Sequence, residues 1–131
     1  FLAGLAHQKW GDKLTEEQEV VAGLSDLIID IYLAESALLR TRKHQAAGRA
    51  SAVMADLTLV LLDATAGRLE LTARRTLATL AEGDELRAHL GLVRRLLRWT
   101  PVNTARLQRR VAARLCELGS YPALLSAGPA G

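Results

Sequence analysis

The sequence is poor in the residues that mark most small-protein scaffolds. A single cysteine, Cys116, excludes an internal disulfide framework and a thiol-based zinc site. Only three prolines and five aromatic residues occur among 131 residues, so the core must be built from leucine, alanine, valine and isoleucine. Leucine and alanine are strong helix formers. We therefore expect an all-α fold, in which Cys116 is a small buried apolar residue.

Long apolar runs and targeting segments are also missing. No stretch approaches the roughly 18 uninterrupted apolar residues of a membrane-spanning helix. The nearest candidate, Leu57–Leu71, is interrupted by Asp63, Arg68 and Glu70. The first residues lack the positive flank and apolar block of a secretory signal. We expect a soluble protein in a reducing, cytoplasmic compartment, with peripheral contact to a membrane as an alternative.

Apolar residues recur with the helical period along most of the chain. A short helix is predicted over residues 1–10, and four principal helices are predicted over 16–42, 49–81, 84–97 and 101–118. Asp84 is expected to cap the third of these. Thr100 is expected to cap the fourth, with Pro101 at its first helical position. We predict one antiparallel helical bundle domain over residues 1–122 and a flexible tail over 123–131.

The first principal helix has an unusually wide apolar surface. Seven of its residues follow the helical period: Val20, Leu24, Leu27, Ile28, Ile31, Leu38 and Leu39. Ile29 and Leu33 widen this surface beyond one stripe. A helix that is apolar on most sides is buried on most sides. Either this helix lies at the centre of the bundle, or part of it faces another chain or a missing domain.

Charge is distributed unevenly along the chain. Residues 1–85 hold 13 acids and 9 bases, whereas residues 86–131 hold eight arginines and one acid, Glu117. Seven of these arginines form a candidate surface for an anionic partner: Arg94, Arg95, Arg98, Arg106, Arg109, Arg110 and Arg114. They are expected either to pair with the acidic half and an absent neighbouring domain, or to meet an anionic membrane or protein. Nucleic acid is disfavoured because only Trp99 is available for base stacking.

No residue pattern indicates catalysis, cofactor binding or metal binding. Phosphate loops, nucleophile elbows and paired cysteines are absent. His89 has Glu85 four residues before it, which we interpret as an exposed helix-stabilising pair, because two ligands are too few for a metal site. Asp56, Asp63 and Glu70 recur every seven residues. A carboxylate metal site would require a Glu-x-x-His motif that is absent, so we expect an acidic stripe facing arginines of the last two helices.

Two segments resemble a known family. Thr15–Lys43, TEEQEVVAGLSDLIIDIYLAESALLRTRK, resembles the helix that opens the extra C-terminal domain of very-long-chain acyl-CoA dehydrogenases and their bacterial relatives. The likeness lies in a polar turn with a Glu-Gln pair and a core like Ile29-Asp30-Ile31-Tyr32. Two later segments are also similar to that domain. One is Thr-Pro-Val-Asn at Thr100–Asn103, where a new helix is predicted to begin, and the other is the ending RLCELGSYP, from Arg114 to Pro122.

The resemblance implies a larger parent enzyme that binds FAD. Such an enzyme removes hydrogens from the α and β carbons of an acyl-CoA thioester with a glutamate base, and its flavin and catalytic segments lie upstream. No catalytic or FAD-binding residue is therefore carried over to this chain, for which we expect no cofactor of its own. The implied partners are the catalytic domains of the same polypeptide, a second subunit in a homo-oligomer and, in some members, a membrane.

Overall fold

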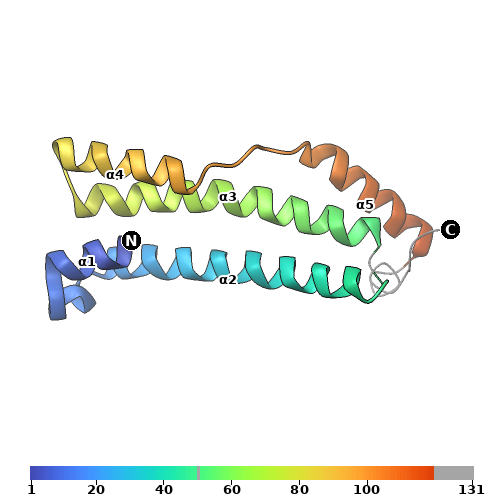
Figure 1. Cartoon of the computed structure of the whole chain (residues 1–131), viewed down its shortest axis with the longest axis horizontal. Helices are drawn as coiled ribbons and strands as arrows, with labels where there is room; N and C mark the ends of the chain where they lie inside the picture. The colour runs from blue at the N-terminus through green and yellow to red at the C-terminus, as the bar shows by residue number, and fades with distance from the viewer. Residues whose placement is uncertain (50, 120–131) are drawn as a thin grey trace. The chain divides into compact units, whose positions relative to one another are not determined.

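The computed structural model describes residues 1–49 and 51–119. Over this part of the chain it consists of five α-helices and one 3-10 helix, with no β-strand (Figure 1). In chain order these are α1 (Leu2–Trp10), η1 (Gly11–Glu16), α2 (Gln18–Ala46), α3 (Ala52–Leu80), α4 (Gly83–Leu96) and α5 (Thr104–Leu118). The prediction of an all-α fold with one short N-terminal helix and four longer helices is confirmed. The tail predicted for 123–131 lies outside the described residues.

The chain folds as two compact units, and each unit contains half of both long helices. The first unit is formed by Phe1–Tyr32 and Ala66–Trp99, so it holds α1, η1, the first half of α2, the second half of α3, and α4. The second unit is formed by Leu33–Thr65 and, as far as it is described, residues 100–119. It holds the other halves of α2 and α3, together with α5.

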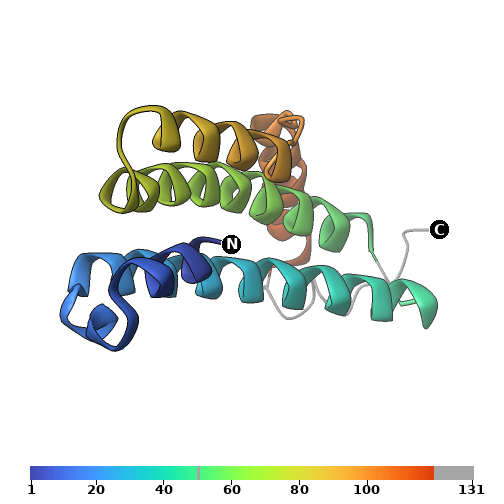
Figure 2. The ribbon, with the colours of Figure 1, turned by 60° about the vertical axis from the view of Figure 1, so that its left-hand side comes forward.

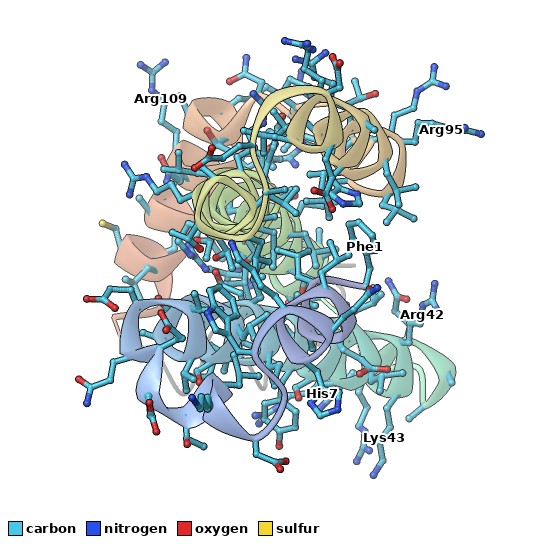
Figure 3. The ribbon with its side chains drawn as sticks, turned by 90° about the vertical axis from the view of Figure 1, so that its left-hand side faces the viewer. Phe1, His7, Arg42, Lys43, Arg95 and Arg109 are labelled. Carbon is cyan, nitrogen blue, oxygen red and sulfur yellow. The ribbon has the colours of Figure 1, made fainter. Side chains whose placement is uncertain are left out.

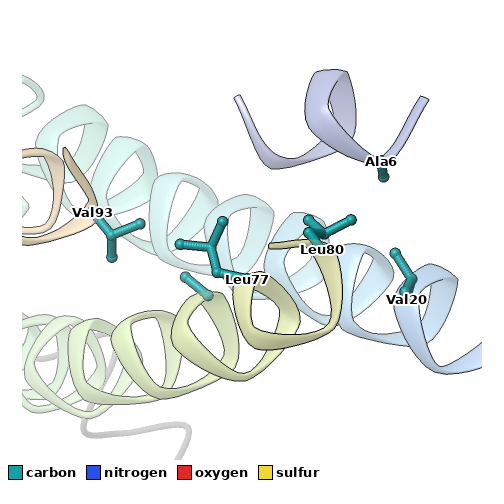
Figure 4. Packing of buried hydrophobic residues seen from close by; sticks show 6 residues of the cluster. Ala6, Val20, Leu77, Leu80 and Val93 are labelled. Carbon is teal, nitrogen blue, oxygen red and sulfur yellow. The ribbon is translucent and has the colours of Figure 1, made fainter. Parts of the chain in front are cut away.

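The first unit has an aliphatic core to which all four of its α-helices contribute. The buried cluster is Ala6, Val20, Ala73, Leu77, Leu80 and Val93, and Figure 4 shows these side chains converging. Ala6 and Leu77 are completely buried. Complete burial of one leucine side chain contributes about 2 kcal/mol relative to exposure. In this unit α1 lies along the start of α2, and α4 lies along the end of α3 (Figure 2).

In the first unit α2 and α3 are antiparallel and approach each other closely. Gly23 faces Thr76, and seven residues further along α2 the carboxylate of Asp30 accepts hydrogen bonds from Arg68. The Arg68 Nε lies 3.1 and 3.2 Å from the two carboxylate oxygens, and Nη2 lies 2.7 Å from Oδ1. This hydrogen bonding raises the pKa of Arg68, while partial burial opposes the shift. A raised arginine pKa stabilises the fold at every pH below the usual arginine value.

A lysine of α1 stabilises the C-terminal end of α3. The Lys9 ammonium donates hydrogen bonds to the carbonyl oxygens of Thr79, at 3.1 Å, and Leu80, at 2.9 Å. It also lies 4.8 Å from the centre of the Trp10 ring. The last carbonyls of a helix carry partial negative charge and lack partners within the helix, so a cation is favourable there. Lys9 thus fixes α1 against the end of α3.

Polar side chains make up much of the buried interior of the second unit. Among the residues of this unit that the structure describes, the buried hydrophobic ones are Met54 and Leu107, and Thr41, Ser51, Asp56, Thr58 and Thr65 are buried as well. The Thr41 and Thr58 hydroxyls lie 2.6 Å apart, and the Thr58 hydroxyl donates to the Met54 carbonyl at 2.9 Å. Since Thr58 uses its only proton in that bond, Thr41 is the donor between the two hydroxyls. This pair links α2 to α3.

The structure corrects several predicted helix ends. The last helix begins at Thr104 rather than Pro101, and its N-cap is Asn103, whose side chain accepts from the Arg106 amide at 3.0 Å. The N-cap of α4 is Glu82, so Asp84 lies in the first turn instead of capping it. The first long helix continues to Ala46. At the end of α5, Gly119 adopts a left-handed conformation with φ of 68°, which glycine tolerates without strain.

Candidate docking surfaces

The metal-ligating residue types do not cluster in the described part of the chain. Among residues 1–49 and 51–119, no three His, Cys, Asp or Glu side chains are arranged so that they could hold a metal ion. The Glu85–His89 pair is confirmed, with 3.5 Å between Oε1 and Nε2, but the His89 side chain is only 20% exposed. Phe1 covers it, with the two rings edge to face and their centroids 5.4 Å apart. The expected exposure of His89 was wrong.

The acidic residues of α3 have three different kinds of partner. Asp56, which is buried, pairs with Arg110 of α5 as predicted. Asp63 instead accepts a hydrogen bond from the backbone amide of Val102 at 2.9 Å, and Glu70 pairs with Arg74 on its own helix. The prediction that all three acids face arginines of the last two helices is therefore wrong for Asp63 and Glu70.

The seven arginines proposed to bind an anion are divided between the two units. Arg94 and Arg95 lie in the last turn of α4, and Arg98 follows that helix in the first unit. All three are exposed, and Arg95 extends away from its helix (Figure 3). Within the described part of the chain, no acidic side chain pairs with any of them.

The other four arginines lie on α5, in the second unit. Arg110 pairs with Asp56, and Arg114 pairs with Glu117 at 2.9 Å. Arg106 and Arg109 are exposed and have no ion-pair partner among the described residues. Arg109 extends away from its helix in Figure 3. Arg106, Arg109 and Arg110 line one shallow hollow, together with Asn103, Ala105 and Ala113.

A second candidate surface is apolar and lies on α2 within the first unit. Its members, which we call the α2 apolar face, are bulky residues on one side of the helix: Val21, Ile28, Ile29, Ile31 and Tyr32. Ile28 and Ile31 follow the helical period identified in the sequence, but their side chains are 66% and 53% exposed, so this part of the helix does not lie at the centre of its unit. Val21 and Tyr32 were not predicted as members of this surface. The spacing of seven and four residues from Val21 through Ile28 to Tyr32 is the signal that identifies them.

Cys116 is exposed, which corrects the expected burial. The last turn of α5 leaves it uncovered, because the buried contact of this helix is made earlier, by Leu107. In the described part of the chain, no helix combines the length and the apolar character needed to cross a membrane.

The chain is similar to acyl-CoA dehydrogenases over most of its length. The family described as "Acyl-CoA dehydrogenase, C-terminal domain" matches residues 1–95. A Bacillus subtilis (strain 168) protein named "Probable acyl-CoA dehydrogenase" is 37% identical over 123 residues, which cover 92% of this chain and 21% of that protein. The crystal structure of an acyl-CoA dehydrogenase complexed with FAD from Bacillus anthracis matches with a TM-score of 0.86 and 34% identity, over 89% of this chain and 20% of that one.

These matches agree with the resemblance found in Thr15–Lys43 and in the segment that begins at Thr100. The chain spans about a fifth of the length of the relatives that it matches. It belongs to the acyl-CoA dehydrogenase C-terminal domain family.

Proposed function

We propose that this chain is a non-catalytic C-terminal accessory domain of an FAD-dependent acyl-CoA dehydrogenase. The observation that carries the proposal is how the matched regions compare in length. About nine tenths of this chain matches only about a fifth of proteins named as acyl-CoA dehydrogenases. The whole parent would oxidise an acyl-CoA thioester to a 2-enoyl-CoA, with the α proton passing to a base and the β hydrogen passing as a hydride to the flavin. The flavin and the base that removes the α proton would lie in the part outside this chain.

The test compares the full-length parent with the isolated 131-residue chain. The purified parent is expected to carry a yellow flavin and to reduce an electron acceptor when acyl-CoA is added. The isolated chain is expected to bind no flavin and to show no turnover, because the flavin and the base would lie in the part of the parent outside this chain. Flavin binding by the isolated chain, or a parent with neither flavin nor turnover, would contradict the proposal.

Several finer features belong to the same proposal. Residues 1–122 act as one accessory domain, followed by the tail over 123–131. The parent is of the very-long-chain type, forms a homo-oligomer and is cytoplasmic. The first and last of the resembling segments, Thr15–Lys43 and Arg114–Pro122, support the very-long-chain type.

A second candidate function is binding of an anionic surface through the arginines of α5. It is favoured by Arg106 and Arg109, which are exposed and have no ion-pair partner in the described part of the chain. The charged face of a helix that lies on an anionic membrane is typically rich in arginine and lysine. We propose peripheral contact with acidic lipid as the role of this surface.

Vesicle flotation of the full-length parent tests this second candidate. Vesicles containing acidic lipid are expected to retain the parent at low salt and to lose it at high salt, because screening shortens the range of charge attraction. The double variant Arg106→Gln/Arg109→Gln should reduce retention at low salt at least several-fold. Equal retention on neutral vesicles, or no effect of the double variant, would refute the role of these arginines.

A further inference from the structure

The α2 apolar face is too large and too regular to be explained as scattered surface residues. Its exposed fractions are 38% for Val21, 66% for Ile28, 54% for Ile29, 53% for Ile31 and 67% for Tyr32. At 100° per residue, Val21, Ile28 and Tyr32 fall within a narrow sector, and Ile29 and Ile31 flank it on either side. Single exposed apolar residues are normal, but contiguous exposed patches mark binding surfaces.

The patch continues onto α3 within the first unit. Ile29 and Leu71, which is 49% exposed, border one hollow whose floor includes the Asp30–Arg68 ion pair. The opposite side of α2 is already occupied by α3, because Gly23 touches Thr76 and Asp30 pairs with Arg68. Val20, at the edge between the two sides, lies in the core. The core of this unit is thus complete without the α2 apolar face, which remains available to an outside partner.

The charges on this stretch of α2 argue against a lipid partner. Residues 18–32 include three acids, Glu19, Asp26 and Asp30, and contain no lysine or arginine. Helices that lie on a membrane surface typically carry basic residues on their polar face, which the anionic headgroups attract. An acidic flank has the opposite effect. The chemistry of the face therefore fits an apolar protein surface.

The size of the face distinguishes between two candidate protein partners, which are a second copy of the chain and the rest of the parent polypeptide. Its five side chains expose on the order of 500 Å², whereas stable contacts between separate proteins bury roughly 800 Å² on each partner. Interfaces between domains of one chain bury roughly 600–1,500 Å² in total, which a patch of this size and a matching surface supply. Covalent linkage removes much of the entropic cost of association, so a smaller interface suffices.

We propose that the α2 apolar face packs against an apolar surface of the parent polypeptide that lies outside this chain. This inference rests on the proposed function, because it requires the four-fifths of the parent by which the relatives exceed this chain. Ile28 and Tyr32 are the central contacts. Burial of the face against the catalytic part would hold this domain in one position on it.

Photo-crosslinking in the full-length parent tests the proposal directly. Tyr32→p-benzoylphenylalanine places the photoreactive group at the centre of the face, and Arg87→p-benzoylphenylalanine is the matched control on α4, where the side chain is 74% exposed. Irradiation of the Tyr32 variant is expected to give an intramolecular crosslink to a peptide outside residues 1–131, identified by mass spectrometry. Its yield should exceed that of the control at least tenfold. A crosslinked dimer, or a yield equal to the control, would overturn the proposal.

A second variant supplies a readout that does not depend on crosslinking. Ile28→Lys in the parent is expected to increase the rate of proteolytic release of this domain at least tenfold, whereas Arg87→Ala should leave it unchanged. Flavin content and acyl-CoA turnover of the wild-type parent are measured first. Turnover without the crosslink refutes the docking face alone, whereas the crosslink without flavin or turnover refutes the proposed function alone.

Discussion

Arg110→Ala is expected to lower the free energy of unfolding of the chain by about 2 kcal/mol. Arg110 pairs with Asp56, whose side chain is only 8% exposed, so the substitution leaves a carboxylate in the interior of the second unit without its cation. Removing one partner of a fully buried pair costs roughly 3–5 kcal/mol. The expected loss lies below this range because Arg110 is half exposed and water can replace part of it. Urea unfolding followed by circular dichroism measures the loss.

The matched control for this change lies one residue earlier on the same helix. Arg109→Ala removes an equally long cation that has no ion-pair partner among the described residues, so it should change stability by less than about 0.5 kcal/mol. Asp56→Asn in the Arg110→Ala background should recover part of the loss, because a neutral amide costs less to bury than a carboxylate. Equal effects of Arg109→Ala and Arg110→Ala would show that the ion pair does not stabilise this unit.

Helices were predictable from the sequence because their cause is local and periodic. Leucine-rich and alanine-rich segments with apolar residues every three or four positions gave all five α-helices. The start of α5 was not predictable from Thr100 and Pro101 alone. The side chain of Asp63, 39 residues away, binds the Val102 amide, and Asn103 provides the cap, so the helix begins three residues later than the proline signal indicates.

The helical period of the sequence did not predict which side of α2 packs inside its unit. This helix is apolar around most of its circumference, and such a pattern does not identify which sector packs inside its own domain. Val20 and Ile28 both follow the helical period, yet Val20 is buried and Ile28 is the more exposed by far. The close contact at Gly23 determines which side of α2 faces α3, because only glycine allows α3 to approach on that side. The hypothesis that part of the helix faces a missing domain survives as a proposal.

The partners of charged residues were likewise only partly predictable from the sequence. A spacing of seven placed Asp56, Asp63 and Glu70 on one side of α3, but it said nothing about which partner each would meet. Glu70 has an arginine four residues later on its own helix, and this local pair was available from the sequence. The Asp56–Arg110 pair depends on how α5 packs in the second unit, so it required the structure.

Gly23→Ala is expected to lower the free energy of unfolding by about 2 kcal/mol, although alanine is the better helix former. A β-carbon at residue 23 would clash with the Thr76 hydroxyl oxygen and would lie 3.5 Å from the Thr76 Cβ. Thr76 is buried and branches at Cβ, which leaves it few favoured rotamers in a helix and limits its ability to move aside. Either α2 and α3 separate locally or Thr76 adopts a strained rotamer, and urea unfolding reports the cost.

The same substitution elsewhere should have the opposite sign. Gly67 lies within α3, and a β-carbon there would meet nothing within 4 Å, so Gly67→Ala should stabilise the chain by up to about 1 kcal/mol. If the Thr76 hydroxyl is the obstacle, Gly23→Ala introduced into a Thr76→Ala background should no longer destabilise. A loss of similar size in both backgrounds would mean that the restriction at position 23 comes from the helix backbones and not from this side chain. The double variant thus decides whether one hydroxyl sets the distance between the two long helices in the first unit.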